Sequence, residues 1–193
     1  MPRPTTADKI LRAAHKLMDR EGPDAVTMRR VAEAVGITPM AIYRHFPNRD
    51  ALLKRISDDS FANVAVEWDA RARDGDFLQG LMKSLEHYLD YALEHPHMFD
   101  HAFSVRRDDA RRFPEDFRAR RSPTLNVIAD RLSEGIQRGL LREVDPWDAA
   151  MTLWALAHGL ISLYRAGRFS YDAGRFRAFY LHSLEIAFDG LKR

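Results

Sequence analysis

Cysteine is absent from the 193 residues, which excludes disulfide bonds, thiolate metal sites and cysteine nucleophiles. The chain also lacks any run of about 18 uncharged apolar residues, the length needed to span a bilayer. Its start, from Met1 to Thr6, does not resemble the apolar centre of a signal peptide. From these absences we expect a cytoplasmic protein with no membrane segment.

Signals for β-structure are missing as well. No run alternates apolar and polar residues with a period of two, and no Asn-Gly or Asp-Gly turn joins two β-branched runs. Apolar residues instead recur with a helical period, stopped by Gly and restarted by Thr, Asn, Asp or Pro. The sequence therefore predicts an all-α fold of nine helices. They are expected at about 6–20, 27–36 and 38–46, then from Asn48, from Asp76 and from Pro96, and finally at 123–139, at 145–167 and from Asp172, with a charged connector at 106–121.

Positive charge is concentrated near the N-terminus. Residues 1–57 contain 11 Lys and Arg against 6 Asp and Glu, whereas the remainder contains 19 against 22. A basic segment on an otherwise slightly acidic protein favours binding of a polyanion. We expect this basic segment, residues 1–57, and the remainder, residues 58–193, to form two separate domains.

Residues 27–46 have the pattern of two short helices that cross steeply. Ala32 is small where the two backbones approach, Gly36 permits the positive φ of a tight turn, and Ile42 is apolar on the inner side of the second helix. Thr38 is a good N-cap and Pro39 a good first helical residue. The pattern predicts a helix-turn-helix whose second helix enters the major groove of DNA by its N-terminal residues.

Side chains with suitable chemistry occupy the expected outer positions. Thr27, at a helix start, can offer its hydroxyl group and backbone N–H groups to a phosphate. Arg49 lies in the first turn of the following helix, where a cation is unfavourable unless an external anion compensates it. Further donors for phosphates or guanine edges are Arg29, Arg30, Tyr43, Arg44 and His45.

Residues 6–60 resemble the DNA-binding domain of the TetR family of bacterial repressors. The resemblance rests on Gly36 followed by Tyr43-Arg44-His45-Phe46-Pro47-Asn48-Arg49. It implies phosphate contacts by Tyr43, His45 and Arg49, base contacts by Thr38, Pro39 and Met40, and additional contacts by Arg29 and Arg44. Met40 and Ala41 depart from the small and hydroxylated residues common there. Together with Pro39 they favour apolar reading, such as contact with thymine methyl groups.

The helix expected at 145–167 is apolar on two faces. Small residues form one stripe, and Leu153, Leu156, Leu160 and Leu163 form the other. Because both faces need covering, we expect the bulky face to pack inside the subunit and the small face to receive a helix of a second chain. With the last helix, this predicts the four-helix bundle of a homodimer. The expected interface residues are Ala155, Gly159, Ser162, Ala166, Phe179, Ser183 and Ile186. A central helix of a monomer is the alternative.

The second half also resembles a TetR subgroup whose C-terminal domain has a Trp…His-Gly element, here Trp154…His158-Gly159. The stretch 95–99 is similar to the subgroup too. This resemblance implies dimerisation through the last two helices. It also implies an effector cavity between the helix that starts at Asn48 and the helix at 145–167.

Large rings with two histidines as polar companions could line such a cavity for a small, mostly apolar or aromatic effector. The candidate residues are His87, Tyr88, Tyr91, Phe99, Phe103, Trp154 and His158. Ordinary core packing explains the same residues without a ligand.

His97 and His101, with Asp100 beside them, have the spacing of metal ligands, but a third ligand is missing. We expect neither a metal nor a cofactor.

These patterns together predict a transcriptional regulator that is not an enzyme. It would act as a homodimeric repressor on a palindromic operator in double-stranded DNA and be released by its effector. A ligand-independent architectural DNA-binding protein is one alternative. An all-helical enzyme or lipid-handling protein is the other, and it would need a nucleophile–base pair or a complete metal set, neither of which the sequence offers.

Overall fold

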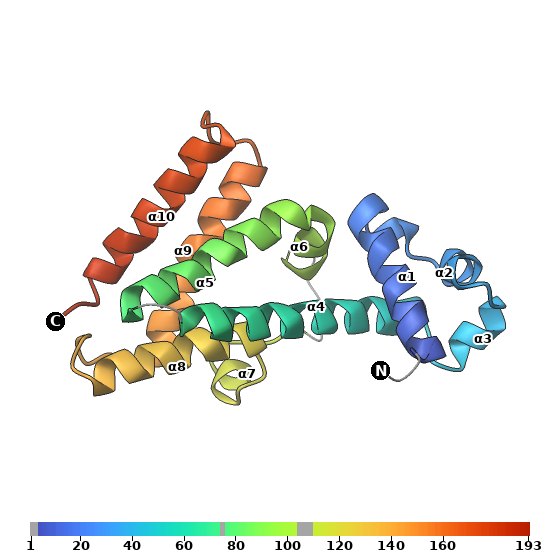
Figure 1. Cartoon of the computed structure of the whole chain (residues 1–193), viewed down its shortest axis with the longest axis horizontal. Helices are drawn as coiled ribbons and strands as arrows, with labels where there is room; N and C mark the ends of the chain where they lie inside the picture. Colours follow the sequence, from blue (N-terminus) through green and yellow to red (C-terminus); the bar gives the residue numbers. More distant parts are fainter. Residues whose placement is uncertain (1–3, 74–75, 104–109) are drawn as a thin grey trace. The chain divides into compact units, whose positions relative to one another are not determined.

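The computed structural model describes residues 4–73, 76–103 and 110–193. Within these ranges the chain folds into ten α-helices and one short 3-10 helix without any β-strand, so the all-α prediction is confirmed (Figure 1). The count is ten rather than nine because a four-residue helix, α7, forms inside the expected connector. The helices are α1 (Thr6–Glu21), η1 (Pro23–Ala25), α2 (Met28–Val35), α3 (Pro39–Tyr43), α4 (Arg49–Ala72), α5 (Phe77–Glu94), α6 (Pro96–Phe103), α7 (Glu115–Arg118), α8 (Pro123–Gln137), α9 (Pro146–Arg165) and α10 (Ala173–Asp189). None of these described helices is both long and apolar enough to cross a membrane.

Short polar side chains begin the helices at the predicted places. Asn48 accepts from the backbone N–H of Ala51 at 2.8 Å, and Asp76, Asp145 and Asp172 cap α5, α9 and α10 in the same way. Each cap satisfies a backbone N–H that the first helical turn leaves without a partner. Helix α3 is shorter than expected, since it ends at Tyr43 rather than at Phe46.

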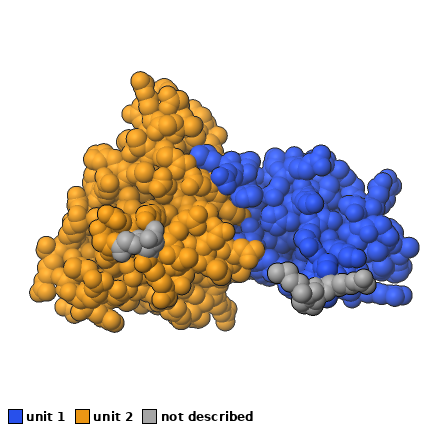
Figure 2. Space-filling model, viewed as in Figure 1, with its two compact units in different colours: residues 1–61, 92–107 blue, residues 62–91, 108–193 orange. Residues whose placement is uncertain are grey.

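The chain divides into two compact units, coloured blue and orange in Figure 2. Unit 1 comprises residues 1–61 and 92–107, and unit 2 comprises residues 62–91 and 108–193. Helices α4 and α5 each contribute residues to both units, and α6 lies in unit 1. The division into domains at residue 57 stays a prediction.

Unit 1 packs α1, α2, α3 and α6 around a small apolar core. Its fully buried side chains include Ile10, Met18, Val31, Ile42 and Met98. The Asp19 carboxylate links α1 to the start of α6, because its two oxygens lie 3.0 Å from Nδ1 of His15 and 3.1 Å from Nδ1 of His95.

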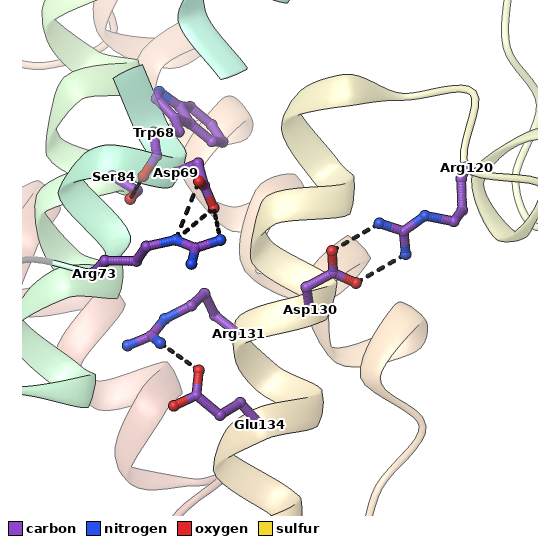
Figure 3. Close-up of polar contacts among 8 residues, drawn as sticks. All are labelled: Trp68, Asp69, Arg73, Ser84, Arg120, Asp130, Arg131 and Glu134. Atoms are coloured by element: carbon purple, nitrogen blue, oxygen red, sulfur yellow. Dashed lines mark hydrogen bonds and ion pairs between the residues drawn. The ribbon is translucent and has the colours of Figure 1, made fainter. Parts of the chain in front are cut away.

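Unit 2 contains a very close crossing of α4 and α5. A Cβ atom added at Gly80 would lie 2.3 Å from the carbonyl oxygen of Ala72, so only glycine fits there. The buried Ser84 hydroxyl donates to the carbonyl oxygens of Trp68 (3.1 Å) and Gly80 (3.2 Å), which ties the two helices at the same point (Figure 3).

The described part of the charged connector forms ion pairs while most of its residues stay exposed. Arg120 binds Asp130 of α8 through two hydrogen bonds of 2.8 and 2.7 Å (Figure 3). Arg118 reaches Asp145 and Asp148 at the start of α9 at 3.0 and 3.1 Å. Residues 110–121 thus stay largely in contact with solvent, and two of their arginines also pair with aspartates of α8 and α9. Arg106, Arg107, Asp108 and Asp109 lie outside the described residues.

Candidate nucleic-acid interface

The turn between α2 and α3 has the geometry that the sequence predicts. Gly36 adopts φ 76° and ψ 35°, a left-handed conformation that a side chain disfavours. Its N–H and that of Ile37 both donate to the carbonyl oxygen of Ala32, at 2.9 and 3.0 Å. Ala32 is 1% exposed and Ile42 is fully buried, so the small residue and the apolar residue hold the crossing of the two helices.

Helix α3 has one inner residue and an otherwise exposed surface. Ile42 faces the core, whereas Met40 is 69% exposed and Tyr43 is 49% exposed. Thr38, Pro39, Arg44 and His45 are exposed as well. The predicted base-contacting and phosphate-contacting residues thus lie together on the accessible surface of one short helix and its end.

Threonine caps position both helices of the motif. Thr27 Oγ1 accepts from the Arg30 N–H at 3.2 Å, and Thr38 Oγ1 accepts from the Ala41 N–H at 3.3 Å. In each case the oxygen serves as the acceptor, so the hydroxyl hydrogen is available to donate outward. Both hydroxyl groups can therefore cap a helix and donate to a phosphate at the same time.

Two arginines near this surface are engaged inside the protein. Arg49 Nε donates to the carbonyl oxygen of Val26 at 2.8 Å, and its Nη2 donates to that of Pro23. Arg30 binds both carboxylate oxygens of Glu21 at 2.9 Å. The expectation that Arg49 needs an external anion is wrong, because these carbonyl groups accept its hydrogen bonds and the Asp24 carboxylate lies 3.8 Å from its Nη2. Its contact with a phosphate stays a prediction.

Arg29 and Arg44 differ from these two residues. Both are exposed, and neither forms an ion pair with any residue that the structure describes. Long cationic side chains in this state can reach phosphates without first breaking an internal contact.

Five of the seven predicted effector residues lie in unit 2. Three of them form a hydrogen-bonded chain. Trp154 Nε1 donates to the Tyr88 hydroxyl at 3.2 Å, and that hydroxyl lies 3.0 Å from Nδ1 of His158. His158 Nε2 lies 3.3 Å from the hydroxyl of Ser162. Burial raises the pKa of Tyr88 and lowers that of His158, so both side chains favour their neutral forms. Tyr91 is buried in this unit, and His87 pairs with Glu67 at 3.0 Å.

The remaining two predicted effector residues lie in unit 1. Phe103 packs against Phe99 and Phe61 with ring centroids 5.1 and 5.6 Å apart. Within each unit these rings contribute to packing, so the effector site as a whole stays a prediction. The described residues contain no group of three or more His, Asp or Glu side chains that could hold a metal ion.

Sequence reasoning did not include Trp68, which lies beside the Tyr88 chain. It is 1% exposed, its ring meets that of Tyr88 edge-on at 5.7 Å, and its Nε1 has no hydrogen-bond partner among the described residues. Its position on an apolar face of α4 is common for core residues, so the sequence held no signal that distinguishes it.

The predicted dimer residues lie on the outer sides of α9 and α10. Ala155 and Ala166 are exposed, Gly159, Ser162 and Ser183 are half-buried, and a Cβ added at Gly159 would meet no atom within 4 Å. Phe179 is 36% exposed and Ile186 is 60% exposed. An apolar and small-residue surface is thus open on these two helices.

One expectation for α9 is wrong. Of the leucine stripe, only Leu153 is buried, and Leu163 is 49% exposed. The face that packs inside the subunit consists of Ala150, Leu153, Ala157 and Ile161. Leu156 and Leu160 are half-buried at the border between this face and the open surface.

The geometry of α2, Gly36 and α3 defines a helix-turn-helix protein of the DNA-binding class. Comparisons with known proteins agree. Residues 10–56 match the family model of bacterial regulatory proteins of the tetR family, and residues 81–184 match the tetracyclin repressor-like C-terminal domain. The chain belongs to the TetR family of bacterial regulators.

The chain is similar to several members in sequence. It is 34% identical to the tetracycline repressor protein class A from transposon 1721 of Escherichia coli over 82 residues, which are 42% of this chain and 38% of that protein. It is 27% identical to the uncharacterized HTH-type transcriptional regulator Rv0681 of Mycobacterium tuberculosis, covering 86% of this chain and 73% of that protein. The chain spans about a fifth to a half of the length of the first curated relatives it matches.

Solved structures share the fold. A TetR-family transcriptional regulator from Pectobacterium atrosepticum aligns with a TM-score of 0.74 at 21% identity, covering 97% of this chain and 94% of that chain. The regulator FadR from Bacillus subtilis, solved with stearoyl-CoA, aligns with a TM-score of 0.73 at 16% identity over 95% and 98% of the two chains.

Proposed function

We propose that this regulator is a repressor that binds a palindromic operator as a homodimer and leaves it when a small effector binds. The exposed surface of α3 carries the proposal, because Thr38, Pro39 and Met40 are accessible together at the N-terminal end of a capped helix. That end is the part of a helix-turn-helix that contacts base edges.

DNA contacts divide by chemistry. Thr38, Pro39 and Met40 read bases, with Met40 and Pro39 making apolar contacts to thymine methyl groups. Tyr43, His45, Arg29, Arg44 and the N-cap Thr27 contact phosphates, which fixes the register of the helix on the duplex. Arg49 adds a phosphate contact at the start of α4.

Dimerisation supplies the specificity that a single α3 lacks. One short helix contacts only a few base pairs, and discrimination grows when two helices read adjacent half-sites. The open surface of α9 and α10, with Ala155, Gly159 and Ser162 beside exposed Phe179 and Ile186, supports a four-helix bundle between two chains.

The effector is a small, mostly apolar or aromatic molecule. The neutral polar groups of Tyr88, Trp154 and His158 would orient it, while His87 and Tyr91 of the same unit contribute further lining. Binding would favour a state in which the two α3 helices no longer match the spacing of the half-sites, which lowers operator affinity.

Footprinting on the promoters that flank the gene tests this proposal. We expect a protected palindrome whose half-sites are centred about 10 base pairs, or a multiple of that, apart. The affinity for this palindrome and for a random duplex of the same length is then measured over a salt series. A preference of at least about 1,000-fold for the palindrome is expected of a specific regulator.

The same measurement separates the proposal from its alternative. An architectural DNA-binding protein would bind both duplexes equally and lose affinity steeply with salt. Equal affinity for the two duplexes, or a chain that stays monomeric at micromolar concentration, contradicts the proposal.

A further inference from the structure

Helix α1 carries four cationic side chains on one strip of its surface. Lys9, Arg12, Lys16 and Arg20 follow each other at intervals of three, four and four residues. At 100° per residue these positions fall within an arc of about 80°, and they extend over about 16 Å of helix. All four are exposed. The spacing of these four residues is visible in the sequence, but the helix-turn-helix motif does not predict it.

The acidic residues of α1 do not neutralise this strip. Asp8 receives hydrogen bonds from the N–H and hydroxyl of Thr5 at 2.8 Å, Asp19 binds His15 and His95, and Glu21 binds Arg30. Each carboxylate of the helix is therefore engaged elsewhere. The four cations form no ion pair with any described residue, and only Arg12 makes a further contact, from Nε to the carbonyl oxygen of Asp8 at 3.3 Å.

Helix α4 shows what an ordinary solvated charged surface looks like in this protein. Several of its cations pair with carboxylates one turn away, as Arg55 does with Asp59 at 2.9 Å and Arg71 with Glu67 at 3.1 Å. Such i, i+4 pairs are typical of helices that face water. Helix α1 departs from this arrangement, because its four cations form no ion pair with a described residue. Arg12 and the Asp8 carboxylate interact only through space.

The same four side chains border a hollow of about 490 Å³ between α1 and the C-terminal end of α2. The other lining residues are Ala13, Leu17, Ala34 and Val35. The lining contains no carboxylate that would repel an anion. Val35 directly precedes Gly36, the turn that leads into α3, so the hollow adjoins the predicted DNA-reading element within unit 1.

We propose that Lys9, Arg12, Lys16 and Arg20 form a second DNA-binding surface, which takes the phosphate backbone of duplex DNA outside the bases read by α3. Duplex DNA carries one charge for about every 1.7 Å of its axis when both strands are counted, so a 16 Å length carries about nine phosphates, more than the four cations need. The inference rests on the proposed DNA binding and extends it, because contacts of this kind raise affinity for every sequence without changing base preference.

The test compares two full-length variants that lose the same charge. The first is Lys9→Gln, Arg12→Gln, Lys16→Gln and Arg20→Gln combined. The control combines Arg142→Gln, Arg168→Gln, Arg175→Gln and Arg193→Gln, four exposed arginines of unit 2 whose side chains form no ion pair among the described residues. Affinity for a random 40-base-pair duplex and for the footprinted palindrome is measured by anisotropy over a salt series, after circular dichroism and thermal melting have confirmed folding.

The α1 variant is expected to lose about 0.9 in the slope of log affinity against log salt for each phosphate contact removed, up to about 3.6 for one subunit and about 7.2 for the homodimer, whereas the control keeps the wild-type slope. The preference for the palindrome over the random duplex stays as in the wild type. A slope unchanged in the α1 variant, or lowered equally in both variants, overturns this inference but leaves the proposed function intact. If the α1 variant kept its DNA affinity but lost binding of poly-glutamate, the surface would instead bind an acidic protein segment. That result would also overturn this inference. A wild-type protein without any preference for the palindrome counts against the proposed function itself.

Discussion

Two regions of this regulator expose large apolar side chains, but the residues around those side chains differ. On α3, a helix of five residues, Met40 and Tyr43 are exposed next to Arg44 and His45, which directly follow the helix. On α9 and α10, Leu163, Phe179 and Ile186 stand beside small residues on helices of 20 and 17 residues.

The difference shows how the surroundings of an exposed apolar side chain indicate its partner. Cationic and hydrogen-bonding neighbours on a short helix suit a polyanion with apolar groups in its grooves, as in DNA. Alanine and glycine neighbours on long helices permit close approach of other helices, as in a dimer bundle. The degree of exposure is similar in both places, so exposure alone would not separate the two functions.

The largest effect is expected from a charge on the α9 and α10 surface. In the proposed symmetric bundle, Ile186→Glu would bury one carboxylate from each subunit. Each buried ion costs several kcal/mol. We expect the dimer dissociation constant to rise by about 100-fold or more, as measured by analytical ultracentrifugation, with operator affinity falling in parallel. Val66→Glu is the control, because Val66 is 71% exposed on α4. If both variants stayed dimeric, the assignment of this surface would be wrong.

A smaller effect is expected from the removal of one hydroxyl group on α3. Tyr43→Phe deletes a hydrogen bond to a charged phosphate, worth about 1.5–3 kcal/mol. Operator affinity should fall by about 10-fold or more, uniformly across operator sequences. Tyr171→Phe, at a 41% exposed tyrosine in unit 2, should leave affinity unchanged in the same anisotropy assay. Equal affinities for the wild type and Tyr43→Phe would remove Tyr43 from the interface.

A change in base preference is expected from Met40→Ala. If Met40 contacts thymine methyl groups, replacing thymine by uracil at the contacted positions weakens wild-type binding by about 1 kcal/mol, or roughly fivefold. The variant should be insensitive to the same replacement, which makes the pair a double-mutant cycle. A uracil effect of equal size in both proteins would show that Met40 does not read the methyl group.

The smallest effect concerns the pH dependence of stability in unit 2. Burial lowers the pKa of His158 in the folded protein below its ordinary value of 6.5. The unfolded chain therefore binds the proton more readily, and stability falls as the pH drops through about 6.5 towards the folded pKa. Urea unfolding at pH 7.5 and 5.5, at fixed protein concentration, should show a smaller loss for His158→Gln than for the wild type. A loss of the same size in both would contradict this account.

Much of unit 1 could be predicted from the sequence because its determinants are local. A positive φ at Gly36, a buried Ile42 and caps at Thr38 and Asn48 each follow from one residue and its immediate neighbours. The same holds for the caps of α9 and α10. Such features depend little on how distant parts of the chain fold.

Other properties depend on partners distant in sequence, which sequence reasoning missed. Arg49 is bound by carbonyl groups more than 20 residues away, and Arg118 by aspartates at the start of α9. On α9 the leucines at intervals of three and four fitted a buried stripe. The helix is apolar on both sides, however, so packing against α8 and α10 selects Ala157 and Ile161 instead.

The contact between Gly80 and Ala72 limits which residue α5 can carry at position 80. Because an added methyl group would overlap the Ala72 carbonyl oxygen, any residue larger than glycine at position 80 must push the C-terminal end of α4 away from the start of α5. The crossing therefore sets the distance between these two helices inside unit 2, and a substitution at Gly80 would disturb that spacing without altering any exposed residue of α3.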